Sequence, residues 1–167
     1  MSAVDYDFVN WDDNLFITEN RYLNPPGLEN VLHFWKKPRW LYMPLTYTSW
    51  SILAWVSGFV PAEPHGLNPA LFHAVNLIVH VLSVLVIFGI LRLLLSRGFD
   101  QTENDNDKPD SFKINLAAGA GALMFAIHPV QVEPVVWISE LKDLLCGLFS
   151  LLAIKKYLEK AREKQGR

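Results

Sequence analysis

Apolar residues gather into long uninterrupted blocks along this chain. The blocks without Asp, Glu, Lys or Arg cover residues 67–91, 114–132 and 144–154. A helix rises about 1.5 Å per residue, so roughly 20 apolar residues cross the ~30 Å hydrocarbon core of a bilayer. The pattern therefore predicts membrane helices at residues 69–95, 114–132 and 142–158.

Two segments leave the number of spans open. Residues 142–158 have a charge-free part too short to span alone, so Lys155 and Lys156 must extend toward an interface. Residues 40–60 are charge-free and rich in Trp and Tyr, but Pro44 and several Ser and Thr interrupt them. That segment is either a fourth span or an interfacial helix with its aromatic rings at headgroup level. We predict an all-α fold of polytopic membrane helices, with three spans plus one interfacial or fourth helix.

Composition agrees with an integral, multi-pass membrane protein. Hydrophobic residues make up 51% of the chain and charged residues only 19%, below the roughly 25% of charged residues in soluble domains. A soluble protein can bury one apolar helix of this length, but several such helices favour a bilayer. Cys146 is the single cysteine, which excludes an intramolecular disulfide.

The basic residues predict the orientation of the chain. The tail from residue 155 holds six basic residues against the acids Glu159 and Glu163, and bases near span ends favour the cytoplasm. The 98–113 loop is then inside, and the polar residues 128–143 lie on the extracytoplasmic face. This gives an extracytoplasmic region at 1–67, a helix bundle at 68–158 and a basic cytoplasmic tail at 159–167. Because topology explains the basic tail, no nucleic-acid partner is predicted.

The pair Asp12–Asp13 is the first candidate for chemistry. Adjacent carboxylates can provide a general base or hold a hard divalent cation. The alternative is a solvated turn or a helix N-cap, where Asp and Asn are common. Spacing alone favours the turn or cap, and it leaves a metal undetermined.

Polar side chains also occur within the predicted spans. His73, Asn76 and His80 fall on one stripe of the first helix, since successive residues turn by ~100°. A stripe of this kind must face protein rather than lipid. Hydrogen bonding to neighbouring segments is favoured there over contact with a ligand.

A polar segment follows the second predicted span. Pro129 and Pro134 end or break the helix, so His128 and Glu133 can point into a cavity. These residue types suit metal binding, phosphate contact or proton transfer, with a polar helix end as the alternative. Further along, Lys142 either contacts a lipid phosphate or pairs with a neighbouring acid, Glu140 or Asp143, and pairing is favoured.

Taken in order, these segments resemble one family. FVNWDDNLFITENRYL, YMPLTYTSW, FHAVNLIVH and FAIHPVQVEPVVWISELKDLLCGLFSLLAIKKY look like the N-terminal part of the transmembrane and tetratricopeptide-repeat proteins. That family is similar to the protein O-mannosyltransferases and other glycosyltransferases of the GT-C fold. The resemblance implies a partial GT-C-like bundle in the bacterial inner membrane or the ER membrane. Its implied reaction moves a sugar from a polyprenyl-phosphate donor to a hydroxyl acceptor on protein or lipid.

The resemblance also implies a role for each candidate residue. The family's acidic pair in the first outer loop matches Asp12 and Asp13, one of which serves as the general base. Glu133 is the third catalytic candidate, positioning the acceptor or sharing a divalent cation. His128 and Lys142 are implied to bind the phosphate that leaves. An acidic pair outside favours the interfacial interpretation of residues 40–60.

The chain is shorter than the family pattern. Family members have a transmembrane helix before the acidic pair, many helices afterwards and a helical repeat domain. We therefore expect a fragment that is inactive alone and requires other transmembrane helices. Two further functions stay open, namely a non-catalytic membrane module that binds lipid or partner helices, and a piece of a transporter.

Overall fold

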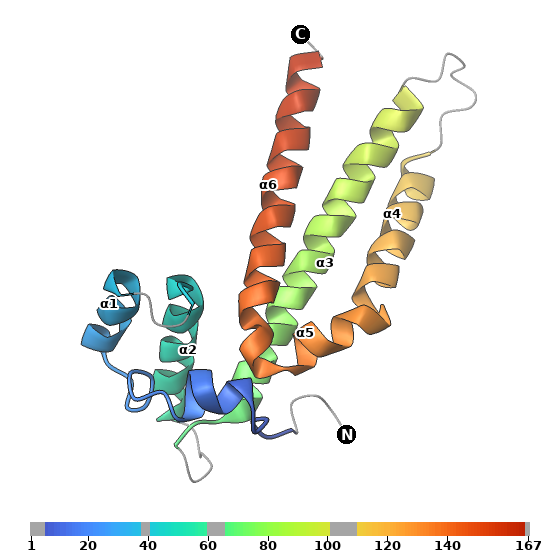
Figure 1. The fold of residues 1–167 in the computed structure, drawn as a ribbon. Helices are drawn as coiled ribbons and strands as arrows, with labels where there is room; N and C mark the ends of the chain where they lie inside the picture. Colours follow the sequence, from blue (N-terminus) through green and yellow to red (C-terminus); the bar gives the residue numbers. More distant parts are fainter. Residues whose placement is uncertain (1–5, 38–40, 60–65, 101–109, 166–167) are drawn as a thin grey trace. The chain divides into compact units, whose positions relative to one another are not determined.

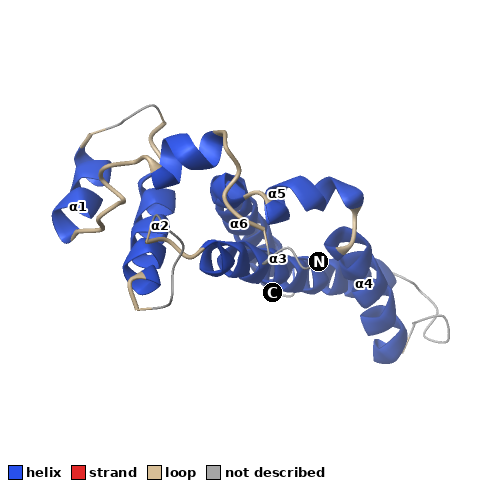
Figure 2. Ribbon diagram, turned by 90° about the horizontal axis from the view of Figure 1, so that it is seen from below, coloured by secondary structure: helices blue, strands red, loops and turns tan. Residues whose placement is uncertain are grey.

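A computed structural model describes residues 6–37, 41–59, 66–100 and 110–165, without the side chains of 97–100 and 165. All regular elements in these ranges are helical (Figure 2), which confirms the all-α prediction. They are, in order, a π-helix at Asn14–Thr18, α1 at Leu28–Lys36, α2 at Pro44–Ser57, α3 at Pro69–Asp100, α4 at Ser111–Ala126, a 3₁₀ turn at Pro129–Gln131, α5 at Val132–Val136, a second 3₁₀ turn at Ile138–Glu140 and α6 at Leu141–Gln165 (Figure 1). Most of the predicted inner loop, residues 101–109, lies outside the described residues.

The described helices contain one clear candidate membrane span. It is Pro69–Ser96 within α3, with 28 residues. A second candidate arises if Ser111–Ala126 and Pro129–Val136, which meet at a bend of 51°, form one span. α6 covers the third predicted helix, but its crossing of the membrane stays a prediction. The structure thus supports one or two of the three predicted spans.

α2 is shorter than a membrane span. Its 14 residues extend about 21 Å at 1.5 Å per residue, less than the ~30 Å hydrocarbon core. The helix starts at Pro44. Proline suits the first turn of a helix, because the amide hydrogen that it lacks would have no partner within the helix at that position. The length of α2 favours the interfacial interpretation of residues 40–60 over a fourth span.

The chain divides into two compact units. The first unit comprises Met1–Ile78 with Glu133–Leu145, and the second comprises Val79–Val132 with Cys146–Arg167. In the first unit an aromatic cluster joins α1 to α2, where the rings of Phe34 and Tyr47 stack with centroids 4.2 Å apart. Trp50 meets Tyr47 edge-on and is fully buried. Such ring pairs add about 0.5–1.5 kcal/mol beyond their buried area.

In the second unit α3 and α4 lie side by side (Figure 1), and small residues make their contact. A Cβ atom at Gly121 would lie 2.8 Å from Leu91 Cδ1, closer than a real side chain allows. Ala118 and Ala122 are buried on the same helix. His80 Nε2 lies 3.1 Å from the carbonyl oxygen of Ala126, so the two helices run antiparallel. α4 therefore packs closely on α3 through its small residues, as is common between membrane helices.

Candidate functional site

Asp13 is fully buried in the first unit. Its Oδ2 accepts a hydrogen bond of 3.0 Å from the amide of Val9, and its Oδ1 accepts one of 2.9 Å from the amide of Ser139. A buried carboxylate is stable only with such partners. The second bond joins positions 126 residues apart in sequence. Asp13 therefore ties the segment before the π-helix to the segment between α5 and α6.

Asp12 stands in a different environment from its neighbour. Its side chain is partly exposed and makes no hydrogen bond or ion pair with the described residues. The two carboxylates of the pair thus have different roles. Asp13 holds the fold together, whereas Asp12 remains available to a ligand. Sequence alone did not distinguish them.

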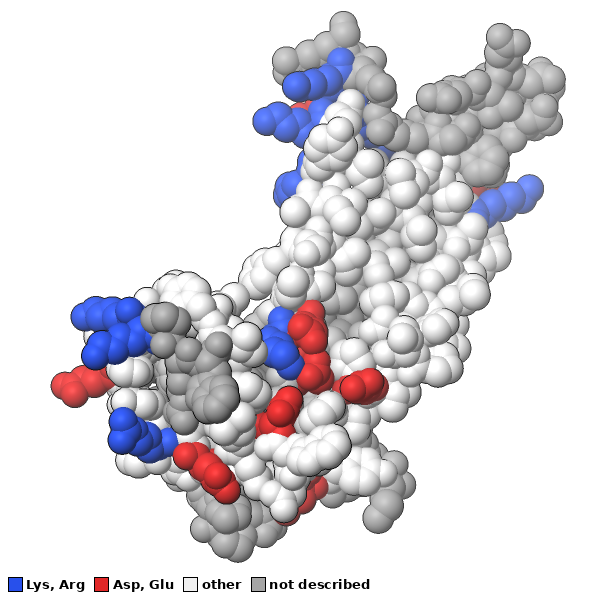
Figure 3. Space-filling model, viewed as in Figure 1, with Lys and Arg blue, Asp and Glu red and all other residues white. Residues whose placement is uncertain are grey.

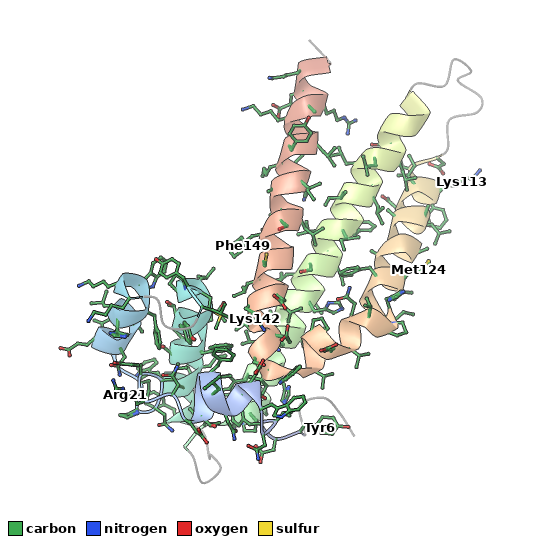
Figure 4. All side chains as sticks on the ribbon, in the orientation of Figure 1. Tyr6, Arg21, Lys113, Met124, Lys142 and Phe149 are labelled. Atoms are coloured by element: carbon green, nitrogen blue, oxygen red, sulfur yellow. The ribbon has the colours of Figure 1, made fainter. Side chains whose placement is uncertain are left out.

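Two polar residues of α3 bond to the same two segments that Asp13 connects. His73 Nε2 lies 3.2 Å from the carbonyl oxygen of Tyr6 (Figure 4), and Asn76 Nδ2 donates to the carbonyl oxygen of Trp137 at 2.8 Å. Both side chains are buried, with exposures of 3% and 1%. Together with His80, they confirm that the polar stripe of α3 faces protein and bonds to neighbouring segments.

Lys142 is paired with a neighbouring acid. Its Nζ lies 2.7 Å from Glu140 Oε1 and donates at 3.4 Å to the carbonyl oxygen of Ser139 (Figure 4). Burial raises the pKa of Glu140, a hydrogen bond with Asp143 raises it further, and Lys142 opposes the change. Acidic side chains gather beside a basic one in Figure 3. The predicted pairing of Lys142 is confirmed.

His128 caps the 3₁₀ turn that follows α4. α4 ends at Ala126, ahead of Pro129, as the two prolines predicted. His128 is exposed, and its Nδ1 accepts a hydrogen bond of 3.2 Å from the amide of Val130. An accepting Nδ1 leaves the proton of a neutral imidazole on Nε2. His128 therefore offers an N–H donor to an incoming group.

Glu133 lies in the first turn of α5 and is exposed. Among the described residues, no hydrogen bond or ion pair connects its side chain to Asp12 or Asp13. The structure thus brings Asp13 to Ser139, whereas Glu133 stays open to solvent. His128 belongs to the second unit and Asp12 to the first.

The described residues hold no group of three or more His, Cys, Asp or Glu side chains placed to bind a metal ion. They do contain a buried hydroxyl that the sequence did not single out for function. Ser139 Oγ has no hydrogen-bond partner in the described part of the chain, although the neighbouring amide is bound by Asp13. The burial of Ser139 next to Asp13 becomes visible only in the three-dimensional structure, because a contact between distant residues leaves no periodic pattern in the sequence.

Comparisons with known proteins agree on one group of relatives. The chain is 33% identical over 174 residues to the protein O-mannosyl-transferase TMTC4 of Homo sapiens, covering 96% of this chain and 21% of the relative. It is 30% identical over 173 residues to TMTC4 of Mus musculus, with the same two coverages. Protein O-mannosyl-transferase Tmtc3 of Drosophila melanogaster is 30% identical over 154 residues, 88% of this chain and 16% of the relative.

The chain spans about a fifth of the length of the two TMTC4 relatives, since it covers 21% of each. No family model matches it. No solved structure matches it either.

Proposed function

We propose that this chain carries part of a membrane glycosyltransferase site, because it belongs to the TMTC family of protein O-mannosyl-transferases. The single observation that supports this most is the hydrogen bond from the Ser139 amide to Asp13. It gathers the two polar segments, which the sequence separates by two apolar helices, into one compact unit. The proposed donor is a polyprenyl-phosphate sugar, and the acceptor is a protein hydroxyl.

Asp12 is the general base of the proposed reaction. Its carboxylate takes the proton of the acceptor hydroxyl while the acceptor oxygen forms a bond to the anomeric carbon of the sugar. The bond between that carbon and the phosphate oxygen breaks with inversion, and the lipid phosphate leaves with the electron pair. Asp13 positions Asp12 and does not itself take part, because both its oxygens accept backbone hydrogen bonds. Glu133, exposed in α5, positions the acceptor.

The leaving phosphate requires donors and positive charge. His128 offers an Nε2–H donor, since Nδ1 is already used by the Val130 amide, but it belongs to the second unit and is not part of the proposed site. Lys142 contributes a positive charge held in place by Glu140. If a divalent cation takes part, Glu133 would be the residue to hold it, and the cation would supply positive charge for the phosphate.

The proposed site lies on the extracytoplasmic face of a multi-pass membrane protein. Support comes from the first unit, which contains residues that precede the α3–α4 pair in the sequence and residues that follow it. A chain that leaves one face of the membrane through α3 must cross again to return to it. The bent pair Ser111–Ala126 and Pro129–Val136 has the length and composition for that return. The basic residues at the end of α6 favour the cytoplasm for the opposite side.

The experiment that tests this function uses a full-length relative with the same acidic pair. We expect Asp→Asn at the position matching Asp12 to lower sugar transfer by at least ~10²-fold, the scale of a lost general base. The measurement is mannose transfer from a polyprenyl-phosphate donor to an acceptor peptide in proteoliposomes. Size-exclusion chromatography of the same sample reports the folded yield, which should stay at the level of the parent protein.

The control is Asp→Asn at the position matching Asp13, which should reduce the folded yield rather than the turnover of the folded fraction. Full turnover of a folded Asp12 variant would exclude Asp12 as the base. A second candidate function, a non-catalytic membrane module, is favoured by the use of Asp13 and Lys142 in internal contacts. It predicts full activity of the relative with either substitution.

A further inference from the structure

A pocket of about 520 Å³ lies between α3 and α6 within the second unit. One part of its lining is apolar and comes mostly from α3. The remainder is polar or charged and comes from the last turns of both helices. The lining residues are Leu85, Phe88, Gly89, Arg92, Leu93, Ser96, Lys155, Glu159 and Arg162.

The charged part of this pocket is positive. Three cations, Arg92, Lys155 and Arg162, face one carboxylate, Glu159, so the formal charge of the lining is 3 − 1 = +2. Glu159 is already paired, with Lys156 Nζ at 2.9 Å and Lys155 Nζ at 3.9 Å. Arg92 and Arg162 make no ion pair with any described residue. Two guanidinium groups are therefore available to an anion, and guanidinium binds phosphate oxygens in pairs.

Gly89 creates the space that Lys155 occupies. A Cβ atom at Gly89 would lie 3.2 Å from Cε and 3.3 Å from Nζ of Lys155. The lysine stem thus lies directly on the backbone of α3, and its ammonium group reaches the pocket. A larger side chain at residue 89 would displace this cation.

We propose that the pocket binds the phosphate headgroup of an anionic membrane lipid. The apolar lining suits the first carbons of the acyl chains, and the cations suit the phosphate, which is the chemistry of basic pockets between membrane helices. The lipid site shares no residue with the proposed sugar-transfer site and does not depend on it.

The test measures thermal unfolding of the purified 167-residue chain in neutral detergent by circular dichroism. Added phosphatidylglycerol should raise the midpoint temperature by several degrees more than phosphatidylcholine at the same concentration. The double variant Arg92→Gln/Arg162→Gln should lose at least half of that difference. The matched control is the double variant Lys160→Gln/Lys164→Gln, because both lysines are exposed, make no ion pair with any described residue and do not line the pocket, and it should keep the whole difference.

Two further arms identify the ligand and the pocket. Inorganic phosphate at the same concentration should give no stabilisation, and an equal effect would overturn the lipid assignment. Gly89→Leu should weaken the phosphatidylglycerol effect by displacing Lys155, whereas Gly147→Leu, where no atom lies within 4 Å, should not. An equal loss in the double lysine control, or an unchanged effect in the double arginine variant, would overturn the proposal. Native mass spectrometry of retained lipid gives the same answer for any variant whose unfolding is not cooperative.

Discussion

The two units of this molecule deal with polar groups in opposite ways. The first unit buries Asp13, His73, Asn76 and Ser139 and satisfies most of their polar atoms with backbone groups of distant segments. The described part of the second unit keeps its charged side chains near the helix ends and leaves long uncharged surfaces (Figure 3). Specific hydrogen bonds between distant segments are therefore concentrated in the first unit, whereas the second unit, as far as it is described, has one such contact, from His80 to Ala126, beside long apolar helices.

Both units expose large apolar side chains, among them Leu28 at 77% in the first unit. Met124 is 71% exposed and Phe149 is 51% exposed (Figure 4). Apolar surfaces of this extent are uncommon on soluble monomers and mark contacts with lipid or with partner proteins. The second unit is thus suited to a bilayer, and the first unit holds the polar groups that chemistry requires.

The largest effect on folding should follow Asp13→Ala. The substitution leaves the amides of Val9 and Ser139 without their acceptor. It also leaves a gap where the buried carboxylate was, and the lost partner of the fully buried Ser139 amide alone costs about 1–3 kcal/mol. We expect the free energy of unfolding to fall by roughly 2–4 kcal/mol. Urea unfolding in neutral detergent, followed by circular dichroism, measures this change. Asp12→Ala is the matched control and should cost less than about 1 kcal/mol, since surface substitutions usually have small effects.

If both aspartate variants unfold at the same urea concentration, hydrogen bonding through Asp13 does not organise the first unit. Hydrogen exchange of the Ser139 amide provides a second measurement. It should become faster in Asp13→Ala and remain slow in Asp12→Ala.

A somewhat smaller effect is expected from Gly121→Val in the second unit. The new side chain would meet Leu91, which lies 2.8 Å from an ideal Cβ, and overpacking typically costs 1–3 kcal/mol. Gly119→Val tests the same chemical change on the same helix, where no atom lies within 4 Å. The difference between the two unfolding free energies should be about 1–2 kcal/mol. Equal stability of the two variants would show that α4 does not pack on α3 through Gly121.

The sequence predicted the features that depend on local pattern. The break after α4 followed from Pro129, the pairing of Lys142 followed from adjacent acids, and the stripe on α3 followed from helical periodicity. The contact between Asp13 and Ser139 was not predictable, because spacing carries no information about positions 126 residues apart. Residues 40–60 were ambiguous because a lack of charge does not fix helix length, and the 14 residues of α2 favour the interfacial interpretation.

The smallest effect concerns the pH dependence of the first unit through Glu140. The folded state raises the pKa of Glu140 above its ordinary 4.5, first through burial and then through Asp143. A raised carboxyl pKa means that folding favours the protonated form. The stabilisation from the neutral carboxyl is therefore complete below pH 4.5 and is lost as the pH rises toward the folded-state pKa. Lys142 opposes this effect, so we expect a change below about 1 kcal/mol.

Glu140→Gln isolates this contribution, because the amide stays neutral at every pH while the other titrating groups are unchanged. The variant should gain stability relative to the parent chain as the pH rises from 4 to 7, and urea unfolding at each pH measures the difference. Asp143→Asn removes the second cause of the raised pKa, and it should make the gain from Glu140→Gln smaller. A parent chain that instead gains stability over the variant with rising pH would mean that the ion pair with Lys142 outweighs burial. In that case the main role of Glu140 is to hold the positive charge of Lys142 in place for the leaving lipid phosphate, and its hydrogen bond with Asp143 is secondary.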